Sequence, residues 1–324
     1  MSQVQVDAEG RRIGWRYRLG RIGFWALIVV ILIYTLFPFY WAFATSLKTE
    51  RELFAPAALF PQTATAINYE SVFGNNQFLR SLVNSAVVAS TTTLLALVVG
   101  SFAAYALGRL RFRGRMLMLY LVLAMTMFPQ ISILSGVFDV VSSLGLFGSL
   151  GALVATYPLI TLPFTVWTLT SFFKGLPAEL EQAALVDGAN AFQTFYMILL
   201  PLTAPALVTT GLLAFISAWN EYLFALTFTT INPTAQTVPV AIALFSGRIS
   251  RQEPIAEIMA ASVVVTIPLI LLAIPSVVIG YVAIEKFLFG DFLANAIFVD
   301  AQAHPAMKQL AAEFHGAAAM ALHG

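Results

Sequence analysis

Side chains able to carry out covalent chemistry are scarce in this sequence. There is no cysteine, which excludes disulfides, thiol catalysis and metal bound through thiolates. The three histidines, His304, His315 and His323, all lie within the last 21 residues, so the rest of the chain has no imidazole for general-base catalysis or metal binding. We therefore predict neither a catalytic site nor a metal site.

The lysines give no sign of nucleotide chemistry either. A P-loop needs a Gly-Lys-Ser/Thr sequence, and none of the four lysines follows a glycine. We therefore predict that the chain is not an enzyme, has no ATPase site of its own and binds no cofactor. If it belongs to a pump, then ATP and magnesium are bound by a partner ATPase.

The composition indicates a membrane protein. Apolar residues make up 59% of the 324 residues, charged residues make up 10%, and the mean hydropathy is +0.85. Soluble domains usually contain about 45–50% apolar and about 25% charged residues. A soluble fold with as few charges as this chain would expose large apolar patches to water and would aggregate. The net charge of +1 gives no reason to expect nucleic acid as a partner. The sequence therefore predicts an all-α membrane protein surrounded by lipid.

Apolar stretches of the length that a bilayer requires, about 20 residues, recur along the chain. Six qualify as transmembrane helices: 23–45, 82–107, 116–138, 150–173, 202–229 and 259–284. The first stretch and the basic segment before it are both too long for a typical signal peptide, so we expect an uncleaved anchor helix. The predicted organisation is an N-terminal tail (1–22), a six-helix domain (23–289) and a C-terminal tail (290–324).

Arginine is concentrated in the N-terminal tail and in the second connection, where Arg109, Arg111, Arg113 and Arg115 follow one another closely. Lysine and arginine accumulate in the cytoplasmic loops of membrane proteins. Placing both termini in the cytoplasm puts 12 of the 17 basic residues inside and five outside. We therefore expect both termini to be cytoplasmic, and the simplest role for these arginines is to set the topology.

Glu221 is the only Asp, Glu, Lys, Arg or His within the six stretches, apart from residues at their edges. An ion-coupled carrier needs ionisable groups in the membrane to bind and release its ion. One glutamate provides little for that mechanism. An ion-coupled secondary transporter nevertheless stays open as the alternative function, and a membrane scaffold without transport is a third possibility.

The connection 174–201 carries the sequence signals of two short helices. Pro177 suits a first helical turn, and Glu179 and Glu181 are favourable near the positive end of a helix. Asp187 and Gly188 then break the first helix, because glycine can adopt the left-handed conformation of a helix cap.

A second helix is expected from about Ala191 to Pro201. Ala183 and Ala184 are small enough for another surface to approach the first helix closely. The sequence therefore predicts a helix–turn–helix on the cytoplasmic face that can dock a partner. An amphipathic connector lying in the membrane interface is the alternative.

This connection resembles the coupling loop of importer-type ABC permeases. The family pattern is Glu-Ala-Ala, three residues, Gly, nine residues and Ile-x-Leu-Pro. The residues that match it in register are Ala183, Ala184, Gly188, Ile198, Leu200 and Pro201. Gln182 stands where the family usually has glutamate, and Glu179 or Glu181 could replace that charge. The resemblance implies that the contacts with an ATPase involve Glu179, Glu181, Gln182, Ala183, Ala184, Asp187, Gly188, Ala189, Ile198 and Pro201.

The resemblance covers about residues 20–290 and narrows to carbohydrate importers of the maltose-permease type. The stretches that carry it are Ser46-Leu47-Lys48, Asn84-Ser85, Ala103–Ala106 with Arg109, Phe128-Pro129 and Trp219-Asn220-Glu221. Those most similar to the trehalose/maltose branch are Val238–Ala243, Phe245–Gly247 and Glu253-Pro254. The tail after Gly290 departs from the short glycine-rich end usual in the family.

The resemblance implies one of the two permease subunits of an ATP-driven sugar importer, for a disaccharide such as trehalose or maltose. The partners it implies are a second permease subunit, an ABC ATPase dimer that holds ATP and magnesium, and an extracellular sugar-binding protein. The implied location is the cytoplasmic (inner) membrane of a prokaryote.

Five polar or aromatic side chains in the spans are candidates for the substrate path. They are Asn84, Gln130, Trp219, Asn220 and Glu221. The amides and the carboxylate could hydrogen-bond sugar hydroxyls, and the indole could stack on a pyranose ring. The same side chains could instead join helix to helix, as polar residues in membrane spans often do. Both interpretations stay open from the sequence alone.

Overall fold

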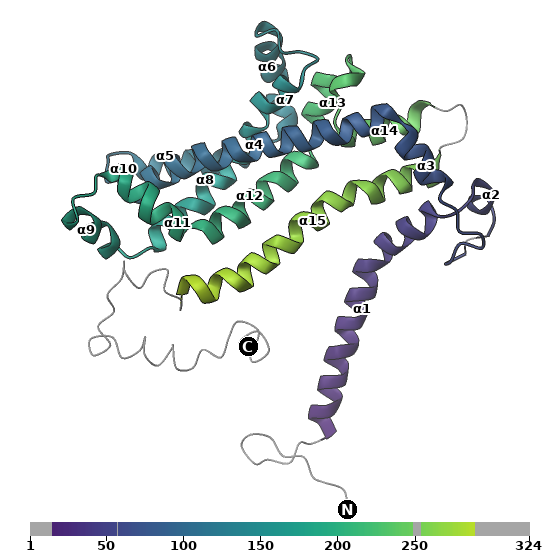
Figure 1. Ribbon diagram of the computed structural model, residues 1–324, viewed down its shortest axis with the longest axis horizontal. Coiled ribbons are helices and arrows are strands. Elements are labelled where there is room, and N and C mark those ends of the chain that lie inside the picture. The colour runs from purple at the N-terminus through teal and green to yellow at the C-terminus, as the bar shows by residue number, and fades with distance from the viewer. Residues whose placement is uncertain (1–14, 57, 249–253, 289–324) are drawn as a thin grey trace, which may run out of the picture. The chain divides into compact units, whose positions relative to one another are not determined.

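The computed structural model describes residues 15–56, 58–248 and 254–288, and its regular elements in these ranges are all helical (Figure 1). The predicted all-α fold class is confirmed. The helices of the first half are α1 (Trp15–Ser46), α2 (Glu50–Leu53), α3 (Ile67–Gly74), α4 (Asn76–Gly108), α5 (Arg115–Met125), α6 (Gln130–Ser143), α7 (Leu150–Thr156) and α8 (Pro158–Gly175).

The helices of the second half include a π-helix and a 3-10 helix among the α-helices. They are α9 (Glu179–Val186), α10 (Ala191–Gln193), the π-helix Thr194–Leu199, α11 (Leu200–Leu202), α12 (Ala204–Trp219), α13 (Leu223–Thr229), the 3-10 helix Pro233–Ala235, α14 (Val238–Arg248) and α15 (Ile255–Leu288). α1 thus begins inside the predicted N-terminal tail. The rest of that tail, Glu253 and the predicted C-terminal tail lie outside the described residues.

Four helical segments in the described ranges are long and apolar enough to cross a membrane, and two bent helix pairs each add one more. The four are Gly20–Ser46, Asn76–Gly108, Leu150–Gly175 and Ile255–Ile274. The bent pairs are Arg115–Met125 with Gln130–Ser143 and Ala191–Leu202 with Ala204–Trp219. Six spans result when each bent pair is counted as one, which agrees with the predicted number.

The third predicted span, 116–138, is broken. α5 ends at Met125 and α6 begins directly after Pro129, with an angle of 98° between the two helices. Proline has no backbone N–H and cannot continue the hydrogen bonds of a helix, which accounts for the position of the break. α6 runs past the predicted end at Phe138 and includes Asp139, which is exposed. Asp139, at the edge of the predicted stretch, therefore lies within α6.

The fifth predicted span, 202–229, is also interrupted. α12 ends at Trp219, and a separate helix, α13, begins at Leu223. Glu221 consequently lies in the break between two helices. The break falls at Asn220 and Glu221, the two most polar residues of the predicted span, and no proline marks it.

The chain forms two compact units, which we describe separately. The first contains the described residues up to Gly74 together with those in the range 245–264. In it, the amide of Asn68 donates to the carbonyl oxygens of Ser46 at 2.8 Å and Lys48 at 2.9 Å, closing the end of α1. The buried Lys48 ammonium donates to the Ala58 carbonyl at 2.7 Å and lies 4.7 Å from the ring centroid of Trp41, a cation–π arrangement.

The second unit contains Asn75–Leu244 and the described residues from Val265 onward, and α4, α8 and α12 pack together within it. Small side chains permit close approach. A Cβ atom added to Gly100 would lie only 2.6 Å from Cγ2 of Thr165, and one added to Gly211 only 2.9 Å from Cδ1 of Leu97. Small residues at such contacts are typical of membrane helices, which gain stability from close packing because lipid is as apolar as their own side chains.

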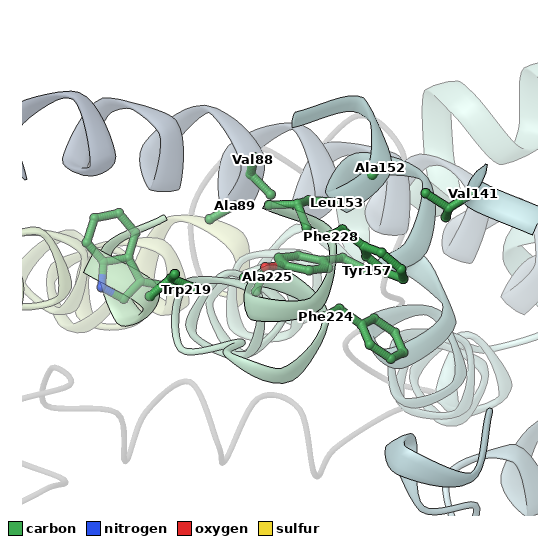
Figure 2. Packing of buried hydrophobic residues seen from close by; sticks show 12 residues of the cluster. Val88, Ala89, Val141, Ala152, Leu153, Tyr157, Trp219, Phe224, Ala225 and Phe228 are labelled. Atoms are coloured by element: carbon green, nitrogen blue, oxygen red, sulfur yellow. The ribbon is translucent and has the colours of Figure 1, made fainter. Parts of the chain in front are cut away.

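An aromatic core holds α13 against α7 and the start of α8. Figure 2 shows the rings of Tyr157, Phe224 and Phe228 gathered beside Leu153, with Trp219 at the side of the cluster. The loops at this end are joined as well, because the Gly148 N–H donates to the Phe228 carbonyl and the Asn232 amide donates to the Gly148 carbonyl, both at 2.8 Å.

Candidate functional site

The loop between α8 and α12 contains a tightly specified turn. The Ala189 N–H donates to the Ala184 carbonyl at 2.9 Å, and the Gly188 N–H donates to the Leu185 carbonyl at 3.1 Å. These two bonds form a Schellman motif, which satisfies the free carbonyls at the end of α9. Gly188 has φ = +82°, so the left-handed glycine predicted from the sequence is confirmed.

The chain re-enters a helix immediately after this turn. The Asn190 side chain accepts from the Gln193 N–H at 2.9 Å, and the Gln193 side chain accepts from the Asn190 N–H at 2.8 Å, which is a capping box. α10 then passes into the π-helix Thr194–Leu199 just before Pro201. Because proline lacks an N–H, the regular pattern of helix hydrogen bonds cannot continue through it, and a π turn occurs next to the interruption.

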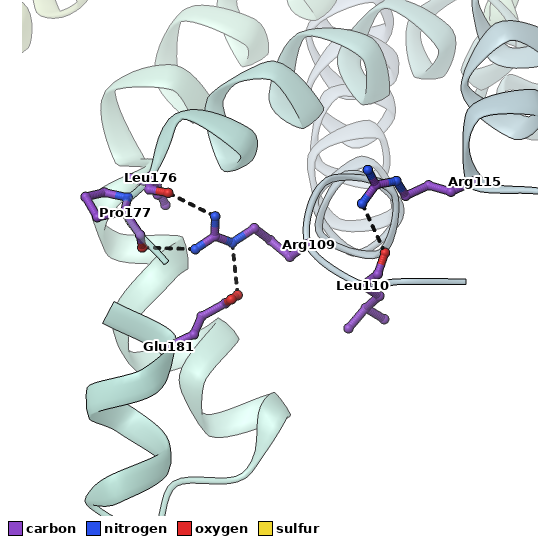
Figure 3. Close-up of polar contacts among 6 residues, drawn as sticks. All are labelled: Arg109, Leu110, Arg115, Leu176, Pro177 and Glu181. Atoms are coloured by element: carbon purple, nitrogen blue, oxygen red, sulfur yellow. Dashed lines mark hydrogen bonds and ion pairs between the residues drawn. The ribbon is translucent and has the colours of Figure 1, made fainter. Parts of the chain in front are cut away.

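Arg109, at the end of α4, fixes the start of this loop (Figure 3). Its Nε donates to Glu181 Oε1 at 3.0 Å, its Nη1 to the Leu176 carbonyl at 2.9 Å and its Nη2 to the Pro177 carbonyl at 3.0 Å. The Arg109 side chain is 9% exposed and the Glu181 side chain 28%. One guanidinium thus ties α4 to the end of α8 and to the first turn of α9.

The second half of the loop is attached to α4 by aromatic packing. The ring of Phe195 lies 5.0 Å from those of Phe102 and Tyr105, measured between centroids, and 6.1 Å from that of Phe173. Phe195 is buried in a cluster with Leu199, Leu169 and Ala206. Both halves of the loop are therefore attached to α4, with which it shares no peptide bond.

The outer surface of α9 only partly matches the predicted docking face. Glu179, Gln182, Ala183 and Asp187 are exposed, but Ala184 is 2% exposed and packs within the chain. The prediction that both alanines lie on the docking face was therefore wrong for Ala184. Ala189, Ile198 and Pro201 are half-buried.

Large apolar side chains complete the exposed surface of the loop. They are Leu185, Val186, Phe192, Tyr196 and Met197, of which Val186 is the most exposed at 88%. A concentration of large exposed apolar side chains in one loop is typical of an interaction site. We call the exposed side chains of residues 179–197 the α9–α10 face.

Asn84, a substrate-path candidate on α4, is occupied by contacts within the chain. It is 7% exposed, and its amide donates at 2.9 Å to the carbonyls of both Thr234 and Gln236. The adjacent Ser85 hydroxyl accepts from the Val238 N–H at 2.8 Å, and Gln77 donates to the Gln236 side chain at 2.9 Å. Asn84 therefore joins α4 to the loop before α14, which is the structural alternative noted from the sequence.

Glu221 also has a structural role in the break between α12 and α13. Its two carboxylate oxygens accept from the N–H groups of Phe224 at 2.9 Å and Ala225 at 3.0 Å. These are free donors of the first turn of α13, so the carboxylate caps that helix.

The other three candidates do not form a common site. Trp219 is buried and stacks on Phe215 at 5.6 Å, while the exposed Asn220 amide donates back to the Ile216 carbonyl at 2.9 Å. Gln130 is the half-buried first residue of α6. Within the described ranges, no hydrogen bond joins one of the five substrate-path candidates to another.

The binding partners of Arg109 could not be predicted from the sequence. In the sequence it is one of four closely spaced arginines, and two of its partners are backbone carbonyls, which no residue type identifies. The useful signal was its position at the end of an apolar stretch, one helical turn after Tyr105. At such a place an arginine can bury its stem while its head group reaches the ends of neighbouring helices.

Comparison with known proteins identifies the family. The sequence model described as "binding-protein-dependent transport system inner membrane component" matches residues 96–279. A chain in the crystal structure of a bacterial ABC transporter involved in the import of the acidic polysaccharide alginate has the same fold, with a TM-score of 0.68 at 21% identity, over 85% of this chain and 98% of that one.

Curated relatives match most of the chain. The trehalose/maltose transport system permease protein MalG of Thermococcus litoralis is 42% identical over 83% of this chain and 94% of its own length. The trehalose transport system permease protein SugB of Mycobacterium tuberculosis is 40% identical over 77% and 91%. The sulfoquinovosyl glycerol transport system permease protein SmoH of Agrobacterium fabrum is 38% identical over 76% and 85%.

These matches confirm the resemblance to ABC importer permeases and agree with the membrane-spanning helices of the fold. The chain belongs to the family of binding-protein-dependent transport system inner membrane components.

Proposed function

We propose that this chain is a permease subunit of an ATP-driven ABC importer for a disaccharide, trehalose or maltose, and that the α9–α10 face docks the ATPase. The observation that carries the proposal is a loop with a largely apolar exposed surface that is fixed to the helix bundle by Arg109 and Phe195. A flexible connector would change its own conformation when the ATPase moves, and the helices would not follow. A loop fixed in this way transmits movement.

Charge supports a cytoplasmic position for the α9–α10 face. The loop contacts the end of α4 that leads into Arg111, Arg113 and Arg115, and Lys174 lies at the end of α8. Basic residues favour the cytoplasmic side of the membrane. With this end inside, the opposite end of the unit, where Asn232 binds Gly148, faces outward, and both termini are cytoplasmic.

The implied partners follow from what the chain lacks and from its family. It has no Gly-Lys-Ser/Thr sequence, so an ABC ATPase dimer would bind ATP and magnesium. The family name refers to a binding protein, which for this chain would be an extracellular sugar-binding protein, and a second permease subunit would complete the pathway. The exposed apolar side chains along α1 are suited to lipid or to that second permease.

In this scheme the chain performs no covalent chemistry and converts one conformational equilibrium into another. ATP-driven closure of the ATPase displaces α9, and α8 and α12 follow through the peptide chain. A ligand shifts such an equilibrium only when it binds the two states with different affinity. The ATPase must therefore make different contacts with the α9–α10 face in its open and closed forms.

The sugar is proposed from the relatives. Two of them, at 42% and 40% identity, are named for trehalose or maltose transport. A third, at 38%, is named for sulfoquinovosyl glycerol, so overall identity alone does not select the substrate. Asn84 and Glu221 are occupied by contacts within the chain, and we therefore propose that most of the sugar contacts lie on the partner permease.

Reconstitution tests the proposal directly. The complete importer is placed in liposomes with ATP inside and the binding protein outside, and entry of radiolabelled trehalose and maltose is measured. We expect uptake of at least one of the two sugars that requires both ATP and the binding protein. Uptake without ATP, or exclusion of both sugars by a complex that hydrolyses ATP, contradicts the proposal.

A further inference from the structure

We propose that α4 transmits the movement of the α9–α10 face to the loop Ile231–Thr237 at the opposite end of the unit, and that Arg109 and Asn84 are the positioning residues at its two ends. The inference rests on the proposed function, because the movement originates at the ATPase. It assigns a role to contacts that neither the family nor the relatives' names describe.

Arg109 joins the loop to a helix that is not its neighbour in the sequence. The peptide chain connects the loop to α8 and α11, whereas Arg109 and the ring cluster around Phe195 connect it to α4. The guanidinium is planar, and three of its five N–H groups donate to three different residues. Turning α9 relative to α4 therefore breaks the ion pair with Glu181, and moving the segment that leads into α9 breaks the two bonds to the carbonyls, all made by a side chain that is only 9% exposed.

A second set of hydrogen bonds holds the other end of α4. Asn84 uses both amide donors on the carbonyls of Thr234 and Gln236, which lie about 150 positions further along the chain. Ser85 and Gln77, on the same stretch of α4, bind Val238 and Gln236. The loop is therefore fixed to α4 through its backbone, and it must follow when α4 moves.

The helix between these two ends is suited to carry a displacement. α4 has 33 residues and no internal proline, so it extends about 50 Å at 1.5 Å per residue. α12, by contrast, is flanked by breaks at Thr203 and at Asn220–Tyr222. α4 is thus one unbroken helix that contacts the loops at both ends of the unit, as its course in Figure 1 shows.

The absence of cysteine allows a direct test, since one engineered cysteine gives a single labelling site. A nitroxide at Val186→Cys reports on α9, and one at Thr234→Cys reports on the outer loop. Both positions are exposed, and the exchange at Thr234 leaves the carbonyl that binds Asn84 in place. Spectra are recorded from the complete importer in liposomes with and without ATP, together with ATP hydrolysed per trehalose imported.

Substitutions at the two ends of α4 should give different results. Arg109→Gln should make the label at position 186 more mobile, suppress the ATP response at position 234 and raise ATP use per sugar by about tenfold. Asn84→Leu should abolish the response at position 234 while the label at position 186 still responds normally.

Arg109→Lys should fall between wild type and Arg109→Gln, because an ammonium can hold Glu181 but not also both carbonyls. Arg113→Gln, an exposed arginine of the same connection, is the matched control and should behave as wild type.

A normal ATP response at position 234 in either Arg109→Gln or Asn84→Leu overturns the inference. A reduced response at position 186 in Asn84→Leu also overturns it, because that result indicates general loosening of the fold. If Arg109→Gln does not assemble, Asn84→Leu alone decides between these outcomes. Failure of the proposed function is distinct, because the wild-type complex would then show no ATP-driven uptake at all.

Discussion

Arg109 Nε lies 3.0 Å from Glu181 Oε1 and joins the end of one membrane helix to the first turn of α9. The Glu181 carboxylate is therefore engaged inside the chain. Of the two acidic residues that could replace the family's glutamate at Gln182, only Glu179 has an exposed side chain. Substitutions of these two carboxylates should therefore have different effects, one on stability and one on binding of the ATPase.

Glu181→Gln should loosen α9, because the neutral amide exchanges an ionic hydrogen bond for a weaker one, at a cost of about 1 kcal/mol. Glu179→Gln should leave the fold unchanged and alter only the affinity for the ATPase. Thermal unfolding of the purified chain, and its binding to the ATPase at two salt concentrations, separate the two effects. Equal thermal stability of the two variants would mean that the pair with Arg109 contributes nothing measurable.

Gly188→Val should uncouple ATP hydrolysis from transport. Gly188 has φ = +82°, and a side chain there costs about 1–2 kcal/mol and favours a different path for the turn into α10. Gly175→Ala is the matched control, since a Cβ at Gly175 meets nothing within 4 Å and its φ is ordinary. The measurement is ATP hydrolysed per sugar imported by reconstituted complexes. Normal transport by Gly188→Val would remove the argument for a rigid turn.

Ala183→Arg and Ala184→Arg should fail at different steps. Ala183 is exposed, so arginine there should leave membrane insertion and helix content intact while preventing the ATPase from co-purifying. Ala184 is 2% exposed, so arginine there should disturb the packing of α9 and lower the yield of folded protein. Full recovery of the ATPase with Ala183→Arg would show that the docking face is somewhere else.

Gly100→Ala should destabilise the contact between α4 and α8, because the new Cβ would lie 2.6 Å from Cγ2 of Thr165. Overpacking of this kind typically costs about 1–3 kcal/mol. Thr165→Ser removes that methyl group and keeps the hydroxyl, which donates to the Thr161 carbonyl. The double variant should therefore regain most of the lost thermal stability. An additive loss in the double variant would show that the methyl contact is not the cause.

The long helices were predictable because a membrane span is a continuous apolar run, and runs such as 82–107 are read directly from the sequence. The Gly188 cap was predictable because its determinants are adjacent in the chain. The extent of the two breaks was not, because a proline such as Pro129 marks only a kink, and the polar pair Asn220-Glu221 does not by itself end a helix. Nor were the partners of Arg109 and Asn84, because these are mainly backbone carbonyls of distant residues, which any side chain could supply.

The energy source gives the last prediction, because it separates an ABC permease from an ion-coupled carrier. Ion coupling in the body of this chain would rest mainly on Glu221, whose carboxylate already accepts two backbone N–H groups of α13. An ion that took this carboxylate would have to compete with the helix cap. Import by the complete complex should therefore require ATP and be indifferent to proton and sodium gradients.

Glu221→Gln should retain that indifference. The amide oxygen can still accept one of the two N–H groups, so the variant should lose some stability and import more slowly, with an unchanged ATP requirement. Glu221→Ala leaves both donors without their acceptor and should be the less stable of the two, by about 1–3 kcal/mol. Uptake by this chain alone, driven by an ion gradient and abolished by Glu221→Gln, would contradict both the capping role of the carboxylate and the dependence on a partner ATPase.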